Sequence, residues 1–403
     1  MPTLRILTTA VVIVSTILLA GADQPLARKS ADEWAEIKKL PNPFVFLDGT
    51  EVRRKEDWNR RRQEINTLFE DDEYGHMPPK PEKMTVKAGE IKVDEEAKAA
   101  RQDLDLNLEH QGESLVLHVR LTLPLKPEGP VPLVVQGGFG RPANAPSPKK
   151  VGPRPNFQRV FTDRGYGVAE YSFQEAAVDN KTAPKTTGVY QLFGGEIDCG
   201  ALMVWAWGIS RVIDAIENDP RIDAKKIVVT GHSRFGKAAL IAGAFEERIA
   251  LTVPSHSGCS GSAPYRFIYG KSEQSQNAVG YAPQWFRPDF NPFVGKVERL
   301  PVDQHLLKAL VAPRALLATE GTQDAWTNPK GSQLTNLAAR RVYDFLGASD
   351  RISFRSRPVG HIPSNDDLLE FADHIFFGKP LSNEFGKLAY AEEKNAFDWD
   401  VPK

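Results

Sequence analysis

The stretch IVVTGHSRFGKAAL, residues 227–240, joins a β-branched run, a glycine-flanked turn and a run of small helix-forming residues. A strand that passes through a glycine turn directly into a helix is typical of the turn that presents a serine nucleophile. The usual form is G-x-S-x-G, whereas the second glycine here comes one residue later, at Gly236. From these residues alone, Ser233 is either a nucleophile or part of a glycine-lined turn that packs or binds an anion.

Short apolar, β-rich runs alternate with helical patterns from residue 130 onward. Besides the stretch above, the runs are PLVVQGG (132–138), GYGVAEYSF (165–173), RIALTVPSHSG (248–258), PRALLATEG (313–321) and RISFRSRPVGH (351–361). Helical patterns lie near 200–217, 235–246 and 331–346. Such runs predict an α/β fold, with a mainly parallel sheet that is covered by helices on both faces.

The first 125 residues show a different sequence pattern. Residues 28–80 carry a charged helical pattern, strongest in DWNRRRQEINTLFEDDEYG (57–75), and residues 83–125 alternate like strands. We therefore predict a single domain over 23–403, in which an N-terminal extension with the first strands (23–125) precedes the catalytic core (126–403).

The first 22 residues have the pattern of a secretory leader. One arginine precedes an apolar stretch from Ile6 to Leu19, and Ala20-Gly21-Ala22 follows it. The stretch is shorter than the ~20 residues of a membrane span. We expect cleavage, a secreted or periplasmic protein and no membrane partner afterwards; an uncleaved anchor is the alternative.

Composition narrows the function classes. The 403 residues are 41% hydrophobic with a formal net charge of -1, so electrostatics give no case for a nucleic-acid partner. The histidines and two cysteines show no zinc spacing, and we expect neither a metal nor a cofactor. Cys199 and Cys259 form either a disulfide or two separate buried thiols. We expect a monomer.

A serine nucleophile needs a base and a group that orients the base. In α/β-hydrolases the chain order is serine, acid, histidine. Glu320 and Asp324 follow one late strand pattern, and His361 follows the next. Loops at the carboxyl ends of such strands are where these sheets build their sites. The residues thus predict a triad of Ser233, Asp324 and His361, with Glu320 as the reserve acid.

The region from Gly194 to His361 resembles the glucuronoyl esterases of carbohydrate esterase family 15, especially their bacterial members. Those enzymes are similar in reading G-x-S-R-x-G-K at the nucleophile, which accounts for the late glycine. The blocks SGCSG, EGTQDAWTNPKG and QWFRPDFNPFVGKVERLPVDQHLLKALVAPRALL also resemble that family. The resemblance implies an α/β-hydrolase that cleaves esters between 4-O-methyl-glucuronate side groups of xylan and lignin alcohols. Glucuronoxylan or a lignin–carbohydrate ester would be its substrate.

The resemblance also implies roles for individual residues. Ser233 matches the nucleophile, His361 the base, and Arg234 the arginine that stabilises the oxyanion. Fungal members carry the acid as a glutamate soon after the nucleophile, whereas His256 stands at that position here. Asp324 is then the natural replacement.

On the sugar side, Lys237 matches a lysine that touches the uronate hydroxyls, and Trp326 a tryptophan that lines the sugar site. Gln274 falls near a sugar-binding glutamine, with Gln276 as a competitor. Ala282 stands where the family often places a sugar-binding glutamate, which puts the uronate specificity in question.

Arg266 has two interpretations: it holds the glucuronate region, or it pins its loop through backbone carbonyls. Asp303 and His305 look structural. Two rival functions stay open, an acetyl xylan esterase or related esterase with the same triad, and a carbohydrate-binding protein without catalysis.

Overall fold

The computed structural model describes residues 29–95, 98–138, 157–183 and 185–403. The expected leader at 1–22 lies outside this part. So does most of the stretch GGFGRPANAPSP (137–148), whose glycines and prolines predict a long loop after a strand, where we expect a second oxyanion donor without assigning it to a residue.

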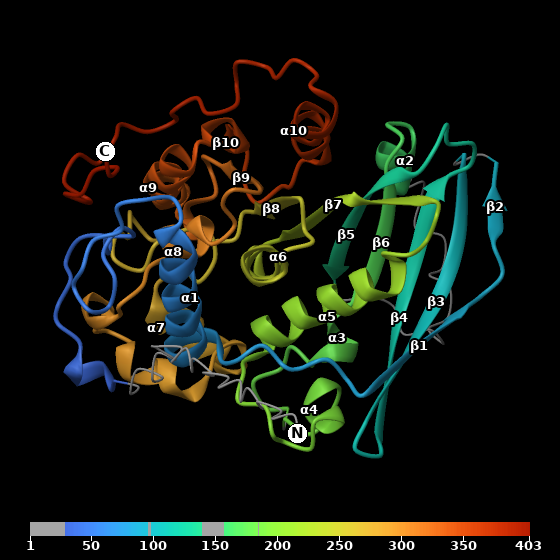
Figure 1. Ribbon diagram of the computed structural model, residues 1–403, viewed down its shortest axis with the longest axis horizontal. Helices are drawn as coiled ribbons and strands as arrows, with labels where there is room; N and C mark the ends of the chain where they lie inside the picture. The colour runs from blue at the N-terminus through green and yellow to red at the C-terminus, as the bar shows by residue number, and fades with distance from the viewer. Residues whose placement is uncertain (1–28, 96–97, 139–156, 184) are drawn as a thin grey trace, which may run out of the picture.

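One ten-stranded sheet runs through the protein (Figure 1). Its strands are β1 (Lys83–Ala88), β2 (Lys92–Asp94), β3 (Ala99–His110), β4 (Glu113–Pro124), β5 (Val131–Gly138), β6 (Gly167–Ser172), β7 (Ile222–His232), β8 (Leu251–Ser255), β9 (Ala315–Gly321) and β10 (Ile352–Arg357). The order is β1-β3-β4-β6-β5-β7-β8-β9-β10, and β2 pairs with β3. Strands β5 to β10 pair in parallel, whereas β1 to β4 join the same sheet through antiparallel pairs.

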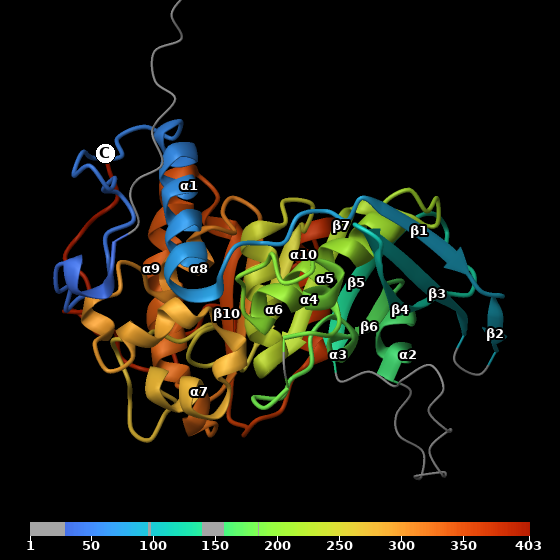
Figure 2. The same ribbon diagram turned by 90° about the horizontal axis from the view of Figure 1, so that it is seen from below.

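Helices cover the sheet and its ends. They are α1 (Asp57–Phe69), α2 (Phe157–Thr162), α3 (Phe173–Ala176), α4 (Val189–Leu192), α5 (Ala201–Ile216), α6 (Arg234–Phe245), α7 (Ser275–Tyr281), α8 (Gln304–Ala309), α9 (Pro329–Leu346) and α10 (Asn365–Phe377). The strands β1 to β4 lie at one end of the molecule, and α1, α8 and α9 lie at the other (Figure 2).

Side chains alternate between two apolar layers, as the pleat of a strand requires. Leu133 and Val135 of β5 belong to the larger core with α5 and α6, whereas Val134 belongs to a second core with α2 and α10. Both faces of the central sheet are therefore buried, which explains why the sequence shows continuous apolar runs there. The mainly parallel sheet with helices on both faces confirms the expected architecture.

The three expected helices match α5, α6 and α9. The charged N-terminal pattern is only partly helical: α1 continues into a π-helical turn over Glu70–Tyr74 and ends at Gly75, whose φ is 82°. Before α1, the described helix is one short 3-10 turn over Ala31–Glu33. Both cysteines are buried free thiols, so the alternative of separate thiols holds.

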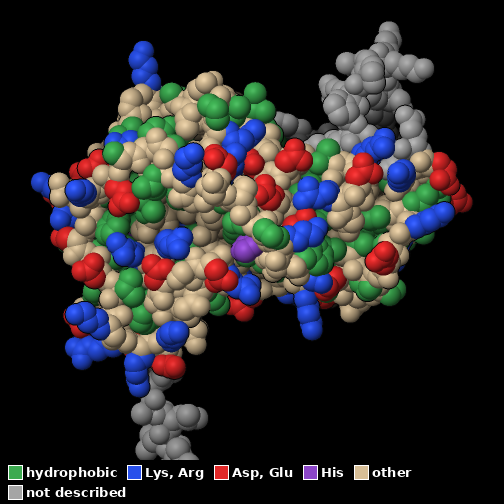
Figure 3. Space-filling model, turned by 90° about the horizontal axis from the view of Figure 1, so that it is seen from above, with side chains coloured by type: hydrophobic (Ala, Val, Ile, Leu, Met, Phe, Trp, Pro, Cys, Tyr) green, Lys and Arg blue, Asp and Glu red, His purple; other side chains and the backbone are tan. Residues whose placement is uncertain are grey.

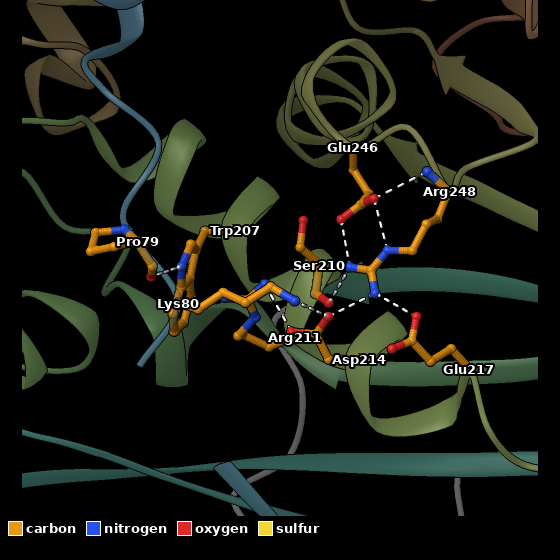
Figure 4. Close-up of polar contacts among 9 residues, drawn as sticks. All are labelled: Pro79, Lys80, Trp207, Ser210, Arg211, Asp214, Glu217, Glu246 and Arg248. Carbon is orange, nitrogen blue, oxygen red and sulfur yellow. Dashed lines mark hydrogen bonds and ion pairs between the residues drawn. The ribbon is translucent and has the colours of Figure 1, made fainter. Parts of the chain in front are cut away.

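A polar cluster ties α5 to the turn after α6 (Figure 4). The Arg248 guanidinium donates to Asp214 at 2.7 Å, to Glu217 at 2.7 Å and to Glu246 at 2.7 Å. Arg211 pairs with the same Asp214 at 2.9 Å. Because the arginine charges are offset by neighbouring carboxylates, we interpret the cluster as structural support for the central helices.

The surface is electrostatically mixed. Acidic and basic side chains are interspersed over the described part of the face in Figure 3, in keeping with the net charge of -1. Within the described residues, no helix is both long and apolar enough to cross a membrane.

Candidate active site

Ser233 occupies a strained turn between β7 and α6. Its backbone lies at φ 59° and ψ −126°, a conformation that residues other than glycine seldom adopt. A Cβ atom at residue 231 would overlap the Phe235 carbonyl oxygen, and one at residue 236 would lie 2.9 Å from the Ser255 carbonyl oxygen. Both positions therefore need glycine, and the late second glycine is explained by close packing of the helix start against β8.

The expected acid and base meet beside this turn. Asp324 lies in the loop after β9, and His361 lies in the loop after β10. Asp324 Oδ2 lies 2.6 Å from His361 Nδ1. His361 remains accessible, with 41% of its side chain exposed, whereas the Asp324 side chain is 7% exposed. Among the described hydrogen bonds none joins Ser233 to His361, and such bonds are often long before substrate binds.

The environment keeps Asp324 ionised. Burial raises the pKa of this carboxyl, but hydrogen bonds with His256 and His361 outweigh burial and hold the pKa well below its usual range. Glu320, the reserve acid, is buried on β9, and burial raises its pKa. It lies near the buried ammonium of Lys308, whose pKa is lowered by burial. The geometry therefore favours Asp324 over Glu320 as the partner of His361.

Two further histidines surround the Asp324–His361 pair. His256 Nδ1 lies 2.8 Å from the same Asp324 Oδ2. The His232 ring lies against the His361 ring, with 4.2 Å between ring centroids. Burial, together with the charges of His361 and His256, lowers the pKa of His232 to about 4. His232 is therefore neutral near pH 7 and packs against His361 without repelling its protonated form.

His256, Asp324 and His361 each offer a metal-ligand type of atom, and these atoms lie within 4.8 Å of one another. The hydrogen bonds of both rings to one carboxylate oxygen already account for this grouping. That the chain needs neither a metal nor a cofactor stays a prediction.

Arg234 is the first residue of α6, so its backbone N–H belongs to the positively polarised first turn beside Ser233. Its guanidinium donates to Asp179 Oδ2 at 2.5 Å. The other oxygen of Asp179 accepts from Trp285 Nε1 at 2.8 Å and from Gln284 Nε2 at 2.9 Å. The Asp179 side chain is only 2% exposed. A buried carboxylate thus fixes the side chain of Arg234, for which the oxyanion role stays a prediction.

Lys237 lies one helical turn after Ser233 but is not a solvated side chain. Its ammonium is 2.9 Å from Glu273 Oε2 and also donates to the Cys259 carbonyl oxygen. Both side chains of this ion pair are buried, at 4% and 3% exposed. Tyr281 donates to the other oxygen of Glu273. An ammonium has three protons, so Lys237 retains at most one hydrogen bond for a sugar.

Trp326 lies next to this buried ion pair and is itself exposed, with 47% of its surface accessible. Its carbonyl oxygen accepts the backbone N–H of Glu273 at 2.9 Å, which joins the tryptophan to the Lys237 ion pair. Gln274 and Gln276 are both exposed next to Glu273, so the geometry does not choose between them. Ala282 is buried, at 2% exposed, and has no polar group to offer.

Arg266 takes the second of its two expected roles. The side chain is 2% exposed and donates to the carbonyl oxygens of Ile37, Val302 and Leu300 as well as to Asp303. Its donors are thus directed to the protein itself, and we correct the expectation of a substrate contact. As expected, Asp303 and the buried His305 are structural: Asp303 caps α8, and His305 bonds the Pro41 carbonyl oxygen.

A cavity of about 990 Å³ adjoins the serine turn on the side of β5 and β6. Gly231 and His232 form part of its described lining, together with polar side chains such as Gln136, Glu170 and Gln158. Polar side chains from β5, β6 and α2 thus line the space next to the serine turn.

A mainly parallel sheet that carries a strained serine at a strand–helix turn, with an acid and a histidine after later strands, is the architecture of the α/β-hydrolases. The predicted fold class is thereby confirmed.

Comparisons with known proteins identify the family. The family model described as glucuronyl esterase of fungi matches residues 106–347. The 4-O-methyl-glucuronoyl methylesterase of Cerrena unicolor is 35% identical over 389 residues, which cover 90% of this chain and 76% of that protein. The chain belongs to the glucuronoyl esterase family.

Solved structures agree. A carbohydrate esterase family 15 glucuronoyl esterase from Caldicellulosiruptor kristjansonii superimposes with a TM-score of 0.77 and 32% identity, covering 92% of this chain and 99% of that one. A glucuronoyl esterase mutant from Sporotrichum thermophile, solved with methyl 4-O-methyl-β-D-glucopyranuronate, gives a TM-score of 0.71 at 27% identity, covering 87% of this chain and 91% of that one. The resemblance inferred from the sequence is confirmed.

The sequence interpretation missed Asp179 and Glu273 and gave His256 no role. Asp179 has no motif around it, because its partners come from distant segments. Glu273 directly precedes the considered Gln274, and a charged residue that neighbours a candidate binding residue was the available signal.

Proposed function

We propose that this protein hydrolyses esters of 4-O-methyl-glucuronate, the side groups of xylan, with Ser233 as nucleophile, His361 as base and Asp324 as orienting acid. The observation that carries the proposal is the 2.6 Å contact between Asp324 and His361 beside the strained Ser233 turn. The family's members that are named 4-O-methyl-glucuronoyl methylesterases support the substrate class.

The reaction follows from the positions of these groups. His361 Nε2 takes the proton of Ser233 as the hydroxyl oxygen attacks the ester carbonyl, and Asp324 holds the opposite nitrogen protonated. Negative charge on the carbonyl oxygen develops near the first turn of α6 and the Arg234 guanidinium, which favour it electrostatically. The alcohol leaves with a proton from His361, and water then hydrolyses the acyl-enzyme by the same steps in reverse.

The wall formed by Trp326, Lys237, Glu273 and Tyr281 suits a sugar. An exposed aromatic face packs against the apolar side of a pyranose, and the polar groups beside it hydrogen-bond its hydroxyls. Glu273 places a carboxylate in this wall, but it is buried and both of its oxygens are already held by Lys237 and Tyr281, so it does not replace the glutamate missing at Ala282. The named relatives are what support a uronate substrate.

We also propose that the protein is exported and that it is a monomer. The N-terminal pattern and the extracellular nature of xylan support a secreted or periplasmic protein that is free of the membrane after cleavage. Hydrolysis of acetyl groups on xylan is the rival activity with the same triad, and a non-catalytic carbohydrate-binding protein is the rival outside catalysis.

The test compares two substrates and one variant. The protein should hydrolyse a benzyl or methyl ester of glucuronate with a far higher kcat/KM than an acetylated sugar, and Ser233→Ala should lower turnover by several orders of magnitude without loss of fold. A fluorophosphonate should label the parent and not the variant. A preference for the acetylated sugar would reject the substrate, and a folded Ser233→Ala protein with near-full turnover would reject the nucleophile.

A further inference from the structure

His256 is a buried histidine that touches the triad without belonging to it. It is 1% exposed, and its Nδ1 lies 2.8 Å from Asp324 Oδ2, the oxygen that also lies 2.6 Å from His361 Nδ1. An ionised carboxylate accepts hydrogen bonds and cannot donate them. Both Nδ1 atoms therefore carry protons, and one oxygen of Asp324 receives two N–H donors.

The backbone holds this ring firmly in place. The His256 N–H donates to the Thr319 carbonyl oxygen at 2.9 Å, which fastens the residue to β9. Its φ is 47°, a left-handed value that non-glycine residues seldom adopt. A Cβ atom at Gly321 would lie 2.8 Å from His256 Cε1, so the ring packs directly against the end of that strand. The ring has little room to turn away from Asp324.

We propose that His256 is a positioning residue, which acts through Asp324 by holding the carboxylate under His361 and by sharing its negative charge. The inference rests on the proposed triad. It gives His256 two effects: it restricts the rotation of the Asp324 carboxylate, and it weakens each single hydrogen bond that the shared oxygen accepts. The second effect divides between two rings the negative charge that Asp324 would otherwise present to His361 Nδ1 alone.

Other titratable groups face this cluster from each neighbouring element. His232 comes from the end of β7 and packs on His361; Glu320 comes from β9, with Lys308 of α8 behind it. Burial, and after it the charge of Glu320, raises the pKa of Tyr390 in the C-terminal segment. Among the titratable groups of the described residues, His256 and His361 are the two whose rings hydrogen-bond the Asp324 carboxylate.

The experiment compares His256→Ala with His256→Asn on a glucuronate ester across pH. Asparagine tolerates a positive φ and places an amide N–H near the position of Nδ1, so it is the matched control that keeps a donor. In His256→Ala we expect kcat to fall on the order of 10- to 100-fold through misplacement of the carboxylate. The acid limb of kcat/KM should move up by about one pH unit because the remaining bond to His361 strengthens. His256→Asn should lie close to the parent on both measures.

Proton NMR of the folded proteins gives a second readout that does not depend on turnover. The parent should show downfield imidazole N–H resonances from both His256 and His361, and each variant should lose that of His256 while retaining that of His361. An unchanged acid limb in a folded His256→Ala protein, or equal losses in the alanine and asparagine variants, would overturn the proposal. Asp324→Asn, measured in the same assays, distinguishes failure of the His256 proposal from failure of the proposed triad. Full activity in Asp324→Asn would reject the triad.

Discussion

The burial of the Lys237–Glu273 ion pair predicts how much stability is lost when one of the two charges is removed. The ammonium and the carboxylate are 2.9 Å apart, and both side chains are at most 4% exposed. Removing one member leaves the other charge buried without its partner, which costs about 3–5 kcal/mol. We therefore expect Lys237→Met and Glu273→Gln each to lower the free energy of unfolding by about this amount.

The double variant Lys237→Met/Glu273→Gln should be far less destabilised than the two single losses together. It removes both charges, so no uncompensated ion remains, and the amide oxygen introduced by Glu273→Gln would still accept a hydrogen bond from Tyr281. We expect a coupling free energy of at least ~2 kcal/mol. Urea unfolding at pH 7, followed by fluorescence of the tryptophans, measures all four proteins with one probe.

Activity separates structural from recognition effects in the same four proteins. If the third proton of Lys237 bonds a sugar hydroxyl, the double variant regains stability but not kcat/KM on the glucuronate ester. The loss should be roughly 5- to 150-fold, with a much smaller loss on a simple aryl acetate. Additive single losses within ~0.5 kcal/mol, or a cost below ~1 kcal/mol for Lys237→Met, would refute the burial argument.

Three further predictions test the site and its surroundings. Asp324→Asn should lower kcat on the order of 10³–10⁴, whereas Glu320→Gln should cost less than about 10-fold in steady-state assays; the reverse order would transfer the acid role. Asp179→Asn removes the charge that fixes Arg234, so kcat should fall on the order of 10-fold with a smaller change in KM; a change confined to KM would contradict this positioning. Burial raises the pKa of Glu73 to about 8, above the ~4.3 of an unfolded chain. The folded protein thus keeps a proton that the unfolded chain releases, so stability is full below about pH 4 and declines toward pH 8. Glu73→Gln should lack this decline in urea titrations.

Sequence patterns predicted the parts of the structure that are determined by residues close together in the chain. The nucleophile turn requires a strand, two glycines and a helix in direct succession, and all of these lie within residues 227–240. The acid and the histidine follow buried strands, and the carboxyl ends of parallel strands meet at one edge of the sheet. The sequence could therefore predict that Ser233, Asp324 and His361 follow strands that end at the same edge of the sheet, whereas their catalytic roles stay a proposal.

The features that the sequence did not predict depend on contacts between irregular segments. Asp179 meets Arg234 from 55 positions away and Trp285 from 106 positions away, with no periodic signal in its own segment. Arg266 has the same sequence neighbourhood whether it faces substrate or backbone, and only its burial decides between the two. The charged stretch before α1 looked helical because polarity alone does not distinguish a surface helix from an ordered loop.

The proposed acid, Asp324, shows how a fold permits a carboxylate to reach the same place from two different loops of a chain. Strands β8 and β9 are parallel neighbours, with Ser255 paired to Thr319, so the loops that follow them emerge side by side. His256 follows β8 immediately, at the position where the resembling fungal enzymes carry a glutamate. The loop after β9 turns back through the Asp324 N–H bond to Gly321 and brings its carboxylate to His256 and His361 together. A carboxylate from either loop thus approaches His361 from the same side. The absence of the early glutamate therefore does not argue against catalysis. His256 fills the space that the glutamate side chain would occupy, and it supports the carboxylate of Asp324.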